Sequence, residues 1–548
     1  MITPLIATPF PNQPPPYEGR NLYLTDVALQ EAVAREGGLA TTELEHWGET
    51  LGSAETFALA DAANRNPPQL RTHDSRGERI DAVEFHLAWH TLMHLATAAG
   101  EHCAPWVDTA TRAHVARAAM YFLHAQVENG TQCPLTMTYA CVPVLRQHAA
   151  SNAALGDWLP RLVVRDYDPR PLPIASKRAV LIGMGMTERQ GGSDVRANLT
   201  RAQPHSDGTW RLRGHKWFFS APQCDGHLVL AQASEGLSCF LLPRFLADGT
   251  RNAVQINRLK DKLGNRSNAS SEVEFHDAVA WPLGEPGRGI ATILEMVQHT
   301  RLDCVIGSAG MMRGALAYAL HYAAHRIAFG RMLSEQPLMM AVLADIALEV
   351  EGATALALRL ARAFDPTSNG RDRALARIMT PAAKYWICKR APMVALEAME
   401  VLGGNGYVEE TPLARIYREA PVNSIWEGSG NVICLDVMRA ARREPATIDA
   451  LFAELDQTRG GNRDLDAHAA LLRDLSTAAD DQASARRFAQ AIAVAFTASL
   501  LVRHAPAFVA DAFCASRLRA DAAFSGAAFG TLPKDMDTAA LIRRASGA

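Results

Sequence analysis

The sequence lacks the features that mark disulfide-bonded, zinc-binding or membrane-spanning proteins. Its 548 residues contain nine cysteines, an odd number, and none of them forms a C-x-x-C pair. This pattern indicates reduced thiols and argues against a disulfide scaffold, and we expect no metal site. The longest uncharged apolar stretch near the carboxyl end, residues 488–502, is shorter than the roughly 20 residues that a membrane-spanning helix needs. We therefore interpret it as a buried helix and expect no membrane partner.

An excess of one charge is also missing. The chain has 55 Lys and Arg residues against 58 Asp and Glu residues, a formal net charge of −3. This near-neutral balance excludes a uniformly basic, histone-like DNA binder. The first residues include the proline-rich stretch 11–16 but no basic region followed by an apolar one, so no secretory signal is expected. These observations predict a cytoplasmic protein of about three or four domains.

Hydrophobic periodicity divides the chain into helical and strand-like parts. Between residues 25 and 152 apolar residues recur three and four apart, as in helices. Short β-branched and aromatic segments then predict a small antiparallel barrel or sandwich: residues 209–220, 227–232, 237–242, 254–259 and 272–279. After Gly289 long helical runs predict a four-helix bundle: residues 293–326, 337–363, 373–402 and 432–443.

The predicted fold class is therefore α+β and multidomain. We expect an N-terminal α-helical domain with a leading extension in residues 1–182 and a central antiparallel β-barrel in residues 183–290. A four-helix bundle follows in residues 291–444, and an additional C-terminal α-helical domain occupies residues 445–548.

Two segments of the predicted β domain combine features that suit a flat, polar ligand. In residues 184–194, Gly191 and Gly192 permit close approach of the backbone, while Thr187 and Ser193 offer hydroxyl groups. Residues 216–220 (KWFFS) place aromatic faces beside one hydroxyl, which suits stacking against a ring. A β-hairpin turn and an ordinary core strand are the alternative interpretations of these two segments.

A third segment carries a candidate base. In residues 397–431, Glu427 lies between Trp426 and Gly428, where desolvation would raise the pKa of its carboxyl group. Ser429 and Asn431 follow at positions that cap a helix, and such a helix N-terminus attracts anions. A solvated capping turn is the alternative. His86, His90 and His94 share one predicted helical face, but no H-E-x-x-H pattern accompanies them, so a structural role is favoured over metal binding.

Together these segments resemble the acyl-CoA dehydrogenase family of flavoproteins. Residues 187–194 are similar to its TE-x-x-x-GSD loop, and residues 262–279 to its K-x-G-x-R-x-S…F-x-D-V stretch. Residues 326–336 resemble its R-x-x-FG…Q motif, and residues 403–428 its GG-x-G…EG segment. Within the family, MGMTE-x-QGGSDV and PVNSIWEGSGN look like the AidB-type alkylation-response branch, a likeness that spans almost the whole chain.

The resemblance implies a bound FAD and a homotetramer. It places Ser220 at the N5 edge of the flavin, and it places Arg326, Phe329, Gln336 and residues 403–406 near the diphosphate of a neighbouring subunit's cofactor. Position by position, it assigns to FAD the residues Met184, Gly185, Met186, Thr187, Gly191, Gly192, Ser193, Phe218, Phe219, Ser220, Arg326, Phe329, Gln336, Gly403, Gly404, Gly406, Ile425, Trp426, Gly428, Ser429 and Asn431.

Glu427 matches the family's catalytic base. The implied reaction is abstraction of the α-proton of an acyl-CoA thioester, with transfer of the β-hydride to the flavin. Trp426 replaces the usual tyrosine and is bulkier, and Arg439 is placed in the substrate channel. We therefore expect poor turnover of short or branched acyl chains only, or a related small molecule as substrate. Two alternatives stay open: a DNA-protecting protein with a structural FAD, and an ordinary catabolic acyl-CoA dehydrogenase.

The last 104 residues are the part that this chemistry does not require. Residues 445–548 hold eleven Lys and Arg residues against twelve Asp and Glu residues. Binding of double-stranded DNA, which the resemblance implies for this region, needs clustered cations rather than many of them. The candidate clusters are Arg486 with Arg487, Arg517 with Arg519, and Arg543 with Arg544.

Overall fold

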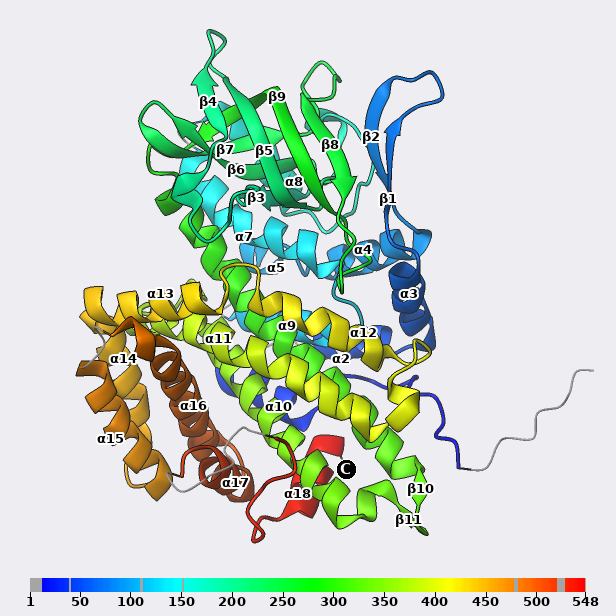
Figure 1. Cartoon of the computed structure of the whole chain (residues 1–548), viewed down its shortest axis with the longest axis vertical. Helices are drawn as coiled ribbons and strands as arrows, with labels where there is room; N and C mark the ends of the chain where they lie inside the picture. The colour runs from blue at the N-terminus through cyan, green and yellow to red at the C-terminus, as the bar shows by residue number, and fades with distance from the viewer. Residues whose placement is uncertain are drawn as a thin grey trace, which may run out of the picture.

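The computed structural model describes residues 12–38, 41–108, 112–149, 152–477, 481–519 and 528–547. Figure 1 shows a β region at one end of the long axis and helices at the other. The chain enters through eight helices: α1 (Val27–Glu36), α2 (Thr41–Leu51), α3 (Ala54–Arg65), α4 (Leu87–Ala99), α5 (Ala104–Val107), α6 (Ala113–Ala125), α7 (Gln132–His148) and α8 (Trp158–Leu162).

A β-hairpin interrupts these helices where the sequence pattern predicted helix alone. Strand β1 (Gln69–His73) pairs antiparallel with β2 (Arg79–Glu84). Asp74 shapes the turn, since its side chain accepts the backbone N–H groups of Arg76 and Glu78 at 2.8 and 2.9 Å. The apolar residue Val83 thus belongs to a strand, and α4 begins at Leu87. The prediction of helix alone between residues 25 and 152 was wrong at this hairpin, because local turn chemistry outweighs a short helical period.

The β region is a closed barrel with additional strands. Its members are β3 (Ile182–Gly185), β4 (Arg201–Pro204), β5 (Trp210–Ser220), β6 (Gly226–Ala233), β7 (Gly236–Pro243), β8 (Val254–Leu259) and β9 (Ser270–Leu283). The pairing order β6–β4–β5–β9–β7 returns to β6, which closes the sheet. Strands β3 and β4 run parallel to β6, so the expectation of a purely antiparallel sheet is corrected to a mixed one. The predicted barrel is otherwise confirmed.

Long helices form the body below the barrel. They are α9 (Gly289–His325), α10 (Pro337–Ala363), α11 (Gly370–Val401), the short α12 (Pro412–Glu419) and α13 (Gly430–Arg443). A small hairpin, β10 (Ile327–Ala328) and β11 (Arg331–Met332), separates α9 from α10. Between α12 and α13 lies the 3₁₀ turn η7 (Ala420–Ser424), which carries the chain toward Glu427. Apolar residues of α9, α10 and α11 form the centre of the largest core.

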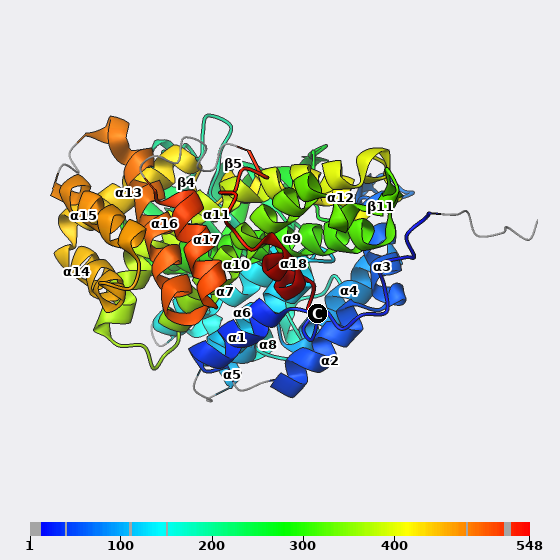
Figure 2. The ribbon, with the colours of Figure 1, turned by 90° about the horizontal axis from the view of Figure 1, so that it is seen from below.

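The last helices pack into the same core. These are α14 (Pro445–Leu455), α15 (Arg463–Thr477), α16 (Ala485–His504), α17 (Ala507–Arg517) and α18 (Thr538–Ser546). Figure 2 shows α14 to α17 stacked side by side against α13 and the bundle. Residues 482–504 are long and apolar enough to cross a membrane, but 78% of their apolar window is buried inside the protein. Helix α16 is therefore a core helix, as expected.

Cysteines and histidines that invited chemical interpretations are structural. All nine cysteines are described, and each is a buried free thiol. His86 precedes α4 and its ring accepts the backbone N–H of Ala88, while the ring of His90 contacts the Tyr167 hydroxyl at 2.9 Å. His86 and His90 therefore contact different partners.

Candidate functional site

Glu427 stands in a backbone conformation that side chains rarely adopt. Its φ is +59°, and the next residue, Gly428, has a φ of +104°. The chain turns sharply here between η7 and α13, so the half-buried carboxyl group is turned back toward α9. There the hydroxyl of Thr300 donates a hydrogen bond of 2.6 Å to Glu427 Oε2. A non-glycine residue held in this region marks a constrained position of the kind found at functional sites.

Two buried cationic side chains bind the backbone of the turn at Glu427 and Gly428. Arg301 donates from Nε to the carbonyl oxygen of Glu427 at 2.9 Å and from Nη1 to Asp436 at 2.7 Å. Lys384, from α11, donates to the carbonyl oxygen of Gly428 at 2.9 Å. Burial raises the pKa of Glu427, while the Thr300 hydrogen bond and the two cations partly oppose the rise. The Glu427 carboxyl group is thus held in place, and its pKa lies above the ordinary carboxyl range.

Sequence reasoning did not find these supporting residues. Thr300, Arg301 and Lys384 lie inside long apolar helices, and no motif around them sets them apart. The burial of Lys384, which is unusual for lysine, becomes visible only in the structure.

The predicted loop in the β region is pinned by a buried ion pair. Glu188 contacts Lys216 Nζ at 2.8 Å and also accepts the backbone N–H of Leu199 at 2.6 Å. Within the loop, a Cβ atom at Gly192 would lie 2.5 Å from Thr187 Oγ1, so only glycine fits there. The loop therefore keeps its hydroxyls and backbone amides in fixed places, and the exposed Ser193 follows at its end.

The three residues predicted beside the flavin do not all point the same way. Phe218 is 53% exposed, whereas Phe219 is buried and stacks on His227 with 3.9 Å between ring centroids. Alternation along β5 explains the difference, since successive side chains of a strand face opposite sides. The assignment of the Phe219 side chain to the cofactor is thus corrected: it belongs to the barrel core. Phe218 and Ser220 stay available at the surface.

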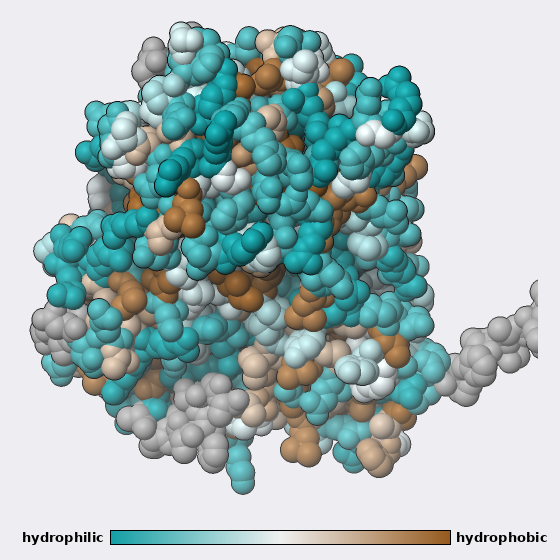
Figure 3. All heavy atoms as spheres, turned by 45° about the horizontal axis from the view of Figure 1, so that its top comes forward, coloured by the Kyte–Doolittle hydropathy of each residue, from teal (hydrophilic) through white to brown (hydrophobic). Residues whose placement is uncertain are grey.

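The β region and the Glu427 turn meet in one place. Met184, Met186 and Trp426 pack in the same apolar cluster, which joins the barrel to α7 and α9. The Cys133 thiol lies near both Lys262 of the barrel and Glu427, since both charges act on its pKa. Figure 3 shows apolar residues gathered along the band between the β region and the helices. The structure thus brings the loop, the KWFFS strand and the candidate base together.

A second group of predicted cofactor residues lies far from this place. Arg326 follows the end of α9, and Thr300, which binds Glu427, lies 26 positions earlier on that helix. At 1.5 Å per residue the separation is about 39 Å. Phe329 is 98% exposed nearby, and Gly403 and Gly404 have open space where a Cβ would stand. One chain does not place both groups around one ligand.

Contacts within the chain occupy several members of this second group. Arg326 Nη1 donates to the carbonyl oxygen of Asn12 at 2.6 Å, and Gln336 Nε2 donates to that of Ala328 at 2.7 Å. Gly406 is different from its neighbours, because a Cβ there would lie 2.2 Å from the carbonyl oxygen of Met399. Its glycine serves close backbone packing.

The start of α13 departs from the predicted capping arrangement. Ser429 occupies the N-cap position, but its side chain makes no capping hydrogen bond. Asn431 lies inside the helix, and its Oδ1 accepts a hydrogen bond of 2.8 Å from Arg486. Arg486 comes from α16, so the last part of the chain reaches the candidate site directly. Ile425, just before Trp426, is 63% exposed.

The two residues predicted in a substrate channel have different surroundings. The Trp426 indole N–H donates to Asn423 Oδ1 at 2.9 Å, which fixes a half-buried ring directly beside Glu427. The side chain of Arg439 is 57% exposed and pairs with Asp436 at 3.4 Å. Asp436 in turn binds Arg301, the residue that holds Glu427. Arg439 is therefore linked to the site through this carboxylate.

The six arginines predicted to bind DNA do not share one face. Arg517 is buried and paired with Asp345 and Glu349 of α10. Arg544 is paired with Glu31 and Glu351. Their assignment as DNA contacts is corrected, because these ion pairs already use their charge. Arg519 lies 3.4 Å from Asp464, and the exposed residues are Arg486, Arg487 and Arg543.

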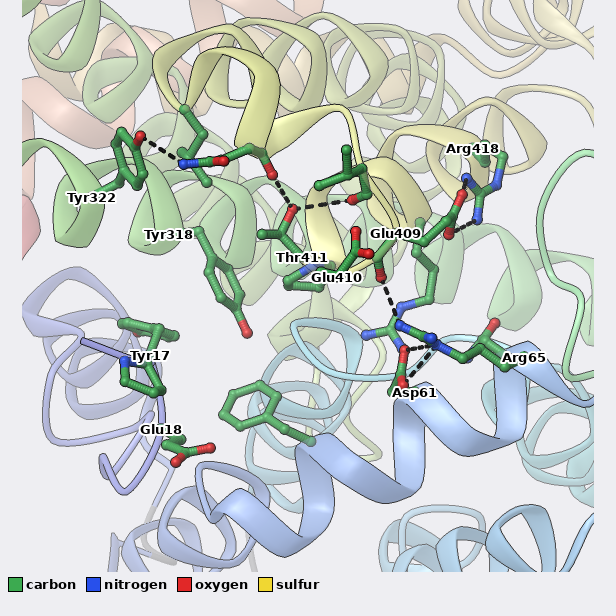
Figure 4. A pocket seen from close by; sticks show the side chains of 18 of the residues that line it. Tyr17, Glu18, Asp61, Arg65, Tyr318, Tyr322, Glu409, Glu410, Thr411 and Arg418 are labelled. Carbon is green, nitrogen blue, oxygen red and sulfur yellow. Dashed lines mark hydrogen bonds and ion pairs between the residues drawn. The ribbon is translucent and has the colours of Figure 1, made fainter. Parts of the chain in front are cut away.

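A cavity of about 910 Å³ lies away from Glu427. Helices α3, α9 and α12, the 264–266 loop and the 13–18 segment surround it, and none of its lining residues belongs to the predicted flavin site. Figure 4 shows that Tyr318 points into it and that Arg418 meets Glu409 at its rim. Arg65 pairs with Asp61 at 2.8 Å. Two ion pairs, Arg418 with Glu409 and Arg65 with Asp61, thus lie on the wall of this cavity.

Comparison with known proteins decides the family. Three family models match successive parts of the chain: the adaptive response protein AidB N-terminal domain at residues 12–169, the acyl-CoA dehydrogenase middle domain at 183–278 and the acyl-CoA dehydrogenase C-terminal domain at 287–442. AidB of Escherichia coli strain K12 is 53% identical over 457 residues, which cover 83% of this chain and 84% of that protein. The chain belongs to the AidB branch of the acyl-CoA dehydrogenase family.

More distant members of the family agree with this assignment. Acyl-CoA dehydrogenase family member 11 of Caenorhabditis elegans is 30% identical over 473 residues, covering 81% of this chain and 74% of that protein. The crystal structure of Caenorhabditis elegans ACDH-11 in complex with C11-CoA has a TM-score of 0.86 at 27% identity and covers 92% of this chain and 93% of that one. The predicted resemblance and fold class are confirmed. The chain is an AidB-type, acyl-CoA dehydrogenase-like oxidoreductase.

Proposed function

We propose that this protein is an FAD-dependent acyl-CoA dehydrogenase of low activity that acts on short or branched acyl-CoA thioesters. The observation that carries the proposal is Glu427, a fixed carboxyl group with a raised pKa, held by Thr300 where the β region meets the helices. Acyl-CoA as the substrate class is supported by the relative whose crystal structure holds C11-CoA.

The residues present fit an FAD. Phe218 is 53% exposed and Ile425, two residues before the candidate base, is 63% exposed, so both offer apolar surface that a flat aromatic ring can cover. The β region contributes the hydroxyl groups of Thr187, Ser193 and Ser220, which can form hydrogen bonds with a cofactor. When bound, FAD supplies the acceptor for the substrate's β-hydride.

Residues of this chain abstract the α-proton of the substrate and orient the group that takes it. Glu427 takes the α-proton onto its carboxylate, and the Thr300 hydroxyl orients that carboxylate through Oε2. Arg301 and Lys384 fix the strained turn by binding its two carbonyl oxygens, so the base does not need to reorganise during the reaction. A raised pKa makes Glu427 a stronger base near neutral pH.

Bleaching of the flavin tests the proposal. We expect isovaleryl-CoA to bleach the yellow protein slowly under anaerobic conditions and palmitoyl-CoA to leave it coloured, because Trp426 is held rigidly beside Glu427. The measurement is absorbance at the flavin band after mixing. Rapid bleaching by the long chain would support an ordinary catabolic dehydrogenase. No bleaching by any acyl-CoA would support the alternative in which FAD is structural.

A homotetramer is part of the proposal. The ends of α9, α10 and α11 and the nearby turns expose several large apolar residues, which monomeric proteins rarely leave together. They include Ile327, Phe329, Leu338, Met393, Leu396 and Tyr407. The same region carries Arg326, which lies too far from Glu427 to serve the same chain's cofactor. A neighbouring subunit's FAD would cover this surface.

DNA binding stays a prediction for this protein. The exposed pair Arg486 and Arg487 at the start of α16 supports it, and the pairing of Arg517 and Arg544 reduces the available charge. We expect weak binding of duplex DNA at ~50 mM salt that falls as salt rises, measured by gel shift. Replacing Arg486 and Arg487 with serine should weaken it. Binding that ignores salt, or no binding at ~50 mM salt, would exclude the phosphate contacts.

A further inference from the structure

Lysine is rare in this chain, which makes its positions informative. There are seven lysines among the 55 basic residues. Three of them are satisfied by carboxylates: Lys177 by Asp225 at 2.5 Å, Lys216 by Glu188 at 2.8 Å and Lys260 by Glu272 at 2.6 Å. Lys262 and Lys384 are buried or half-buried, yet they bind only neutral acceptors within the described residues.

Both of these lysines flank the candidate site. Lys384 stands behind the Glu427 turn and has that carboxylate nearby. Lys262 lies on the segment between β8 and β9, and its Nζ donates to the carbonyl oxygen of Asn268 at 2.7 Å and to Ser270 Oγ at 3.1 Å. An ammonium group has three donors, so one N–H of Lys262 stays without a protein acceptor in the described part of the chain.

Lys262 is connected to the strand that faces the cofactor. Ser270 on β9 is paired with Ser220 on β5, and their hydroxyl oxygens lie 3.3 Å apart. Because Lys262 donates to Ser270 Oγ, the Ser270 hydroxyl hydrogen is free to donate to Ser220. The Ser220 hydroxyl is then free to donate outward. The hydrogen bonds from Lys262 to Ser270 and from Ser270 to Ser220 therefore all donate in the same direction. They lead toward the position that the resemblance gives to the flavin edge.

The charge of Lys262 has no partner close by. The Cys133 thiol and Glu419 act on this charge only electrostatically: burial raises the pKa of Cys133 to about 12, and the oxygens of Glu419 are engaged by the backbone and side chain of Asn265. Burial lowers the pKa of Lys262 to about 8. A buried cation without a counter-ion destabilises the empty protein, and a ligand that carries or gains negative charge relieves this cost.

We propose that Lys262 is a positioning residue of the flavin site, which sets the direction of the Ser270–Ser220 hydroxyl pair and favours the electron-rich, reduced form of the bound flavin. This inference rests on the proposed function, because it requires FAD. It assigns a role to the lysine of the K-x-G-x-R stretch that the reaction itself does not use. Lysine suits this role better than arginine because its charge is compact and its three donors rotate freely.

The test compares Lys262→Met with Arg258→Met, which removes an exposed, Glu272-paired cation nearby. In dye-equilibrated titrations of the holoprotein, Lys262→Met should shift the ratio of reduced to oxidised flavin about tenfold toward the oxidised form. Arg258→Met should leave the ratio within about twofold. Melting of the apoproteins gives a readout without cofactor, and Lys262→Met should melt at the same temperature or higher, since a buried charge is removed.

Ser270→Ala provides a second route to the same answer. It keeps the charge and breaks the hydroxyl chain, so we expect a shift of about threefold in the same direction. A ratio within about twofold of wild type in both variants would overturn the role of Lys262. If Lys262→Met does not fold, the flavin ratio of Ser270→Ala alone tests the role of Lys262, by the same twofold limit. A wild-type apoprotein that fails to bind added FAD would instead refute the proposed function.

Discussion

Replacing Glu427 with glutamine is expected to slow reduction of the bound flavin by isovaleryl-CoA about 10³-fold. The amide has the shape of the carboxylate but does not accept the α-proton. The Thr300 hydroxyl still has an oxygen to bind, so the turn should keep its geometry. Stopped-flow absorbance at the flavin band measures the rate. Glu410→Gln, an exposed glutamate at the distant cavity, is the matched control and should react at the wild-type rate.

The pH dependence of wild-type protein follows from the same carboxyl group. Its pKa lies above the ordinary carboxyl range because burial disfavours the charged form. The base works only when deprotonated, so flavin reduction should be fast above this raised pKa and decline as pH falls through it. In Glu427→Gln the rate should no longer decline as pH falls through this pKa, so the acidic limb of the rate–pH profile should vanish. A variant that keeps a rate within about tenfold of wild type, with the limb intact, would show that another group takes the proton.

The candidate base and the loop near it could be singled out from the sequence because each lies in a short, continuous motif. Trp426, Glu427 and Gly428 are adjacent, so their chemistry is visible before any folding is considered. The residues that hold the base were not predictable. Thr300 is separated from Glu427 by 127 positions, and only packing of α9 beneath the turn brings the two together.

Burial was the second property that the sequence did not reveal. Arg517 and Arg519 are two positions apart and look alike in the sequence, yet the Arg517 side chain is buried in ion pairs with α10 and Arg519 is half-buried. The acidic partners, Asp345 and Glu349, stand far earlier in the chain and inside an apolar helix. Strand alternation separates Phe218 from Phe219, but a register shift between Lys216 and Phe219 decides which of the two rings faces the core, and the sequence does not show this shift.

The largest effect on stability is expected from the last part of the chain. Phe496 of α16 is fully buried in the core that also contains the bundle helices. At Gly352 of α10 an added Cβ would lie 2.8 Å from Thr497, so the two helices are in close contact. Arg359 of α10 also binds Glu454 of α14 at 2.8 Å. Helices α14 and α16 are therefore packed into the core that the bundle helices form.

Replacing Phe496 with alanine should lower the free energy of unfolding by about 3–5 kcal/mol, because it removes a large ring and leaves a cavity. Urea unfolding followed by circular dichroism and by release of FAD fluorescence measures it. Both signals should shift to lower urea together, since one core serves α10 and α16. Leu471→Ala, at a side chain of α15 that is 44% exposed, should change the free energy by less than about 0.5 kcal/mol. Release of FAD at the wild-type urea concentration, with only the circular dichroism shifted, would show that the last helices fold as a separate unit.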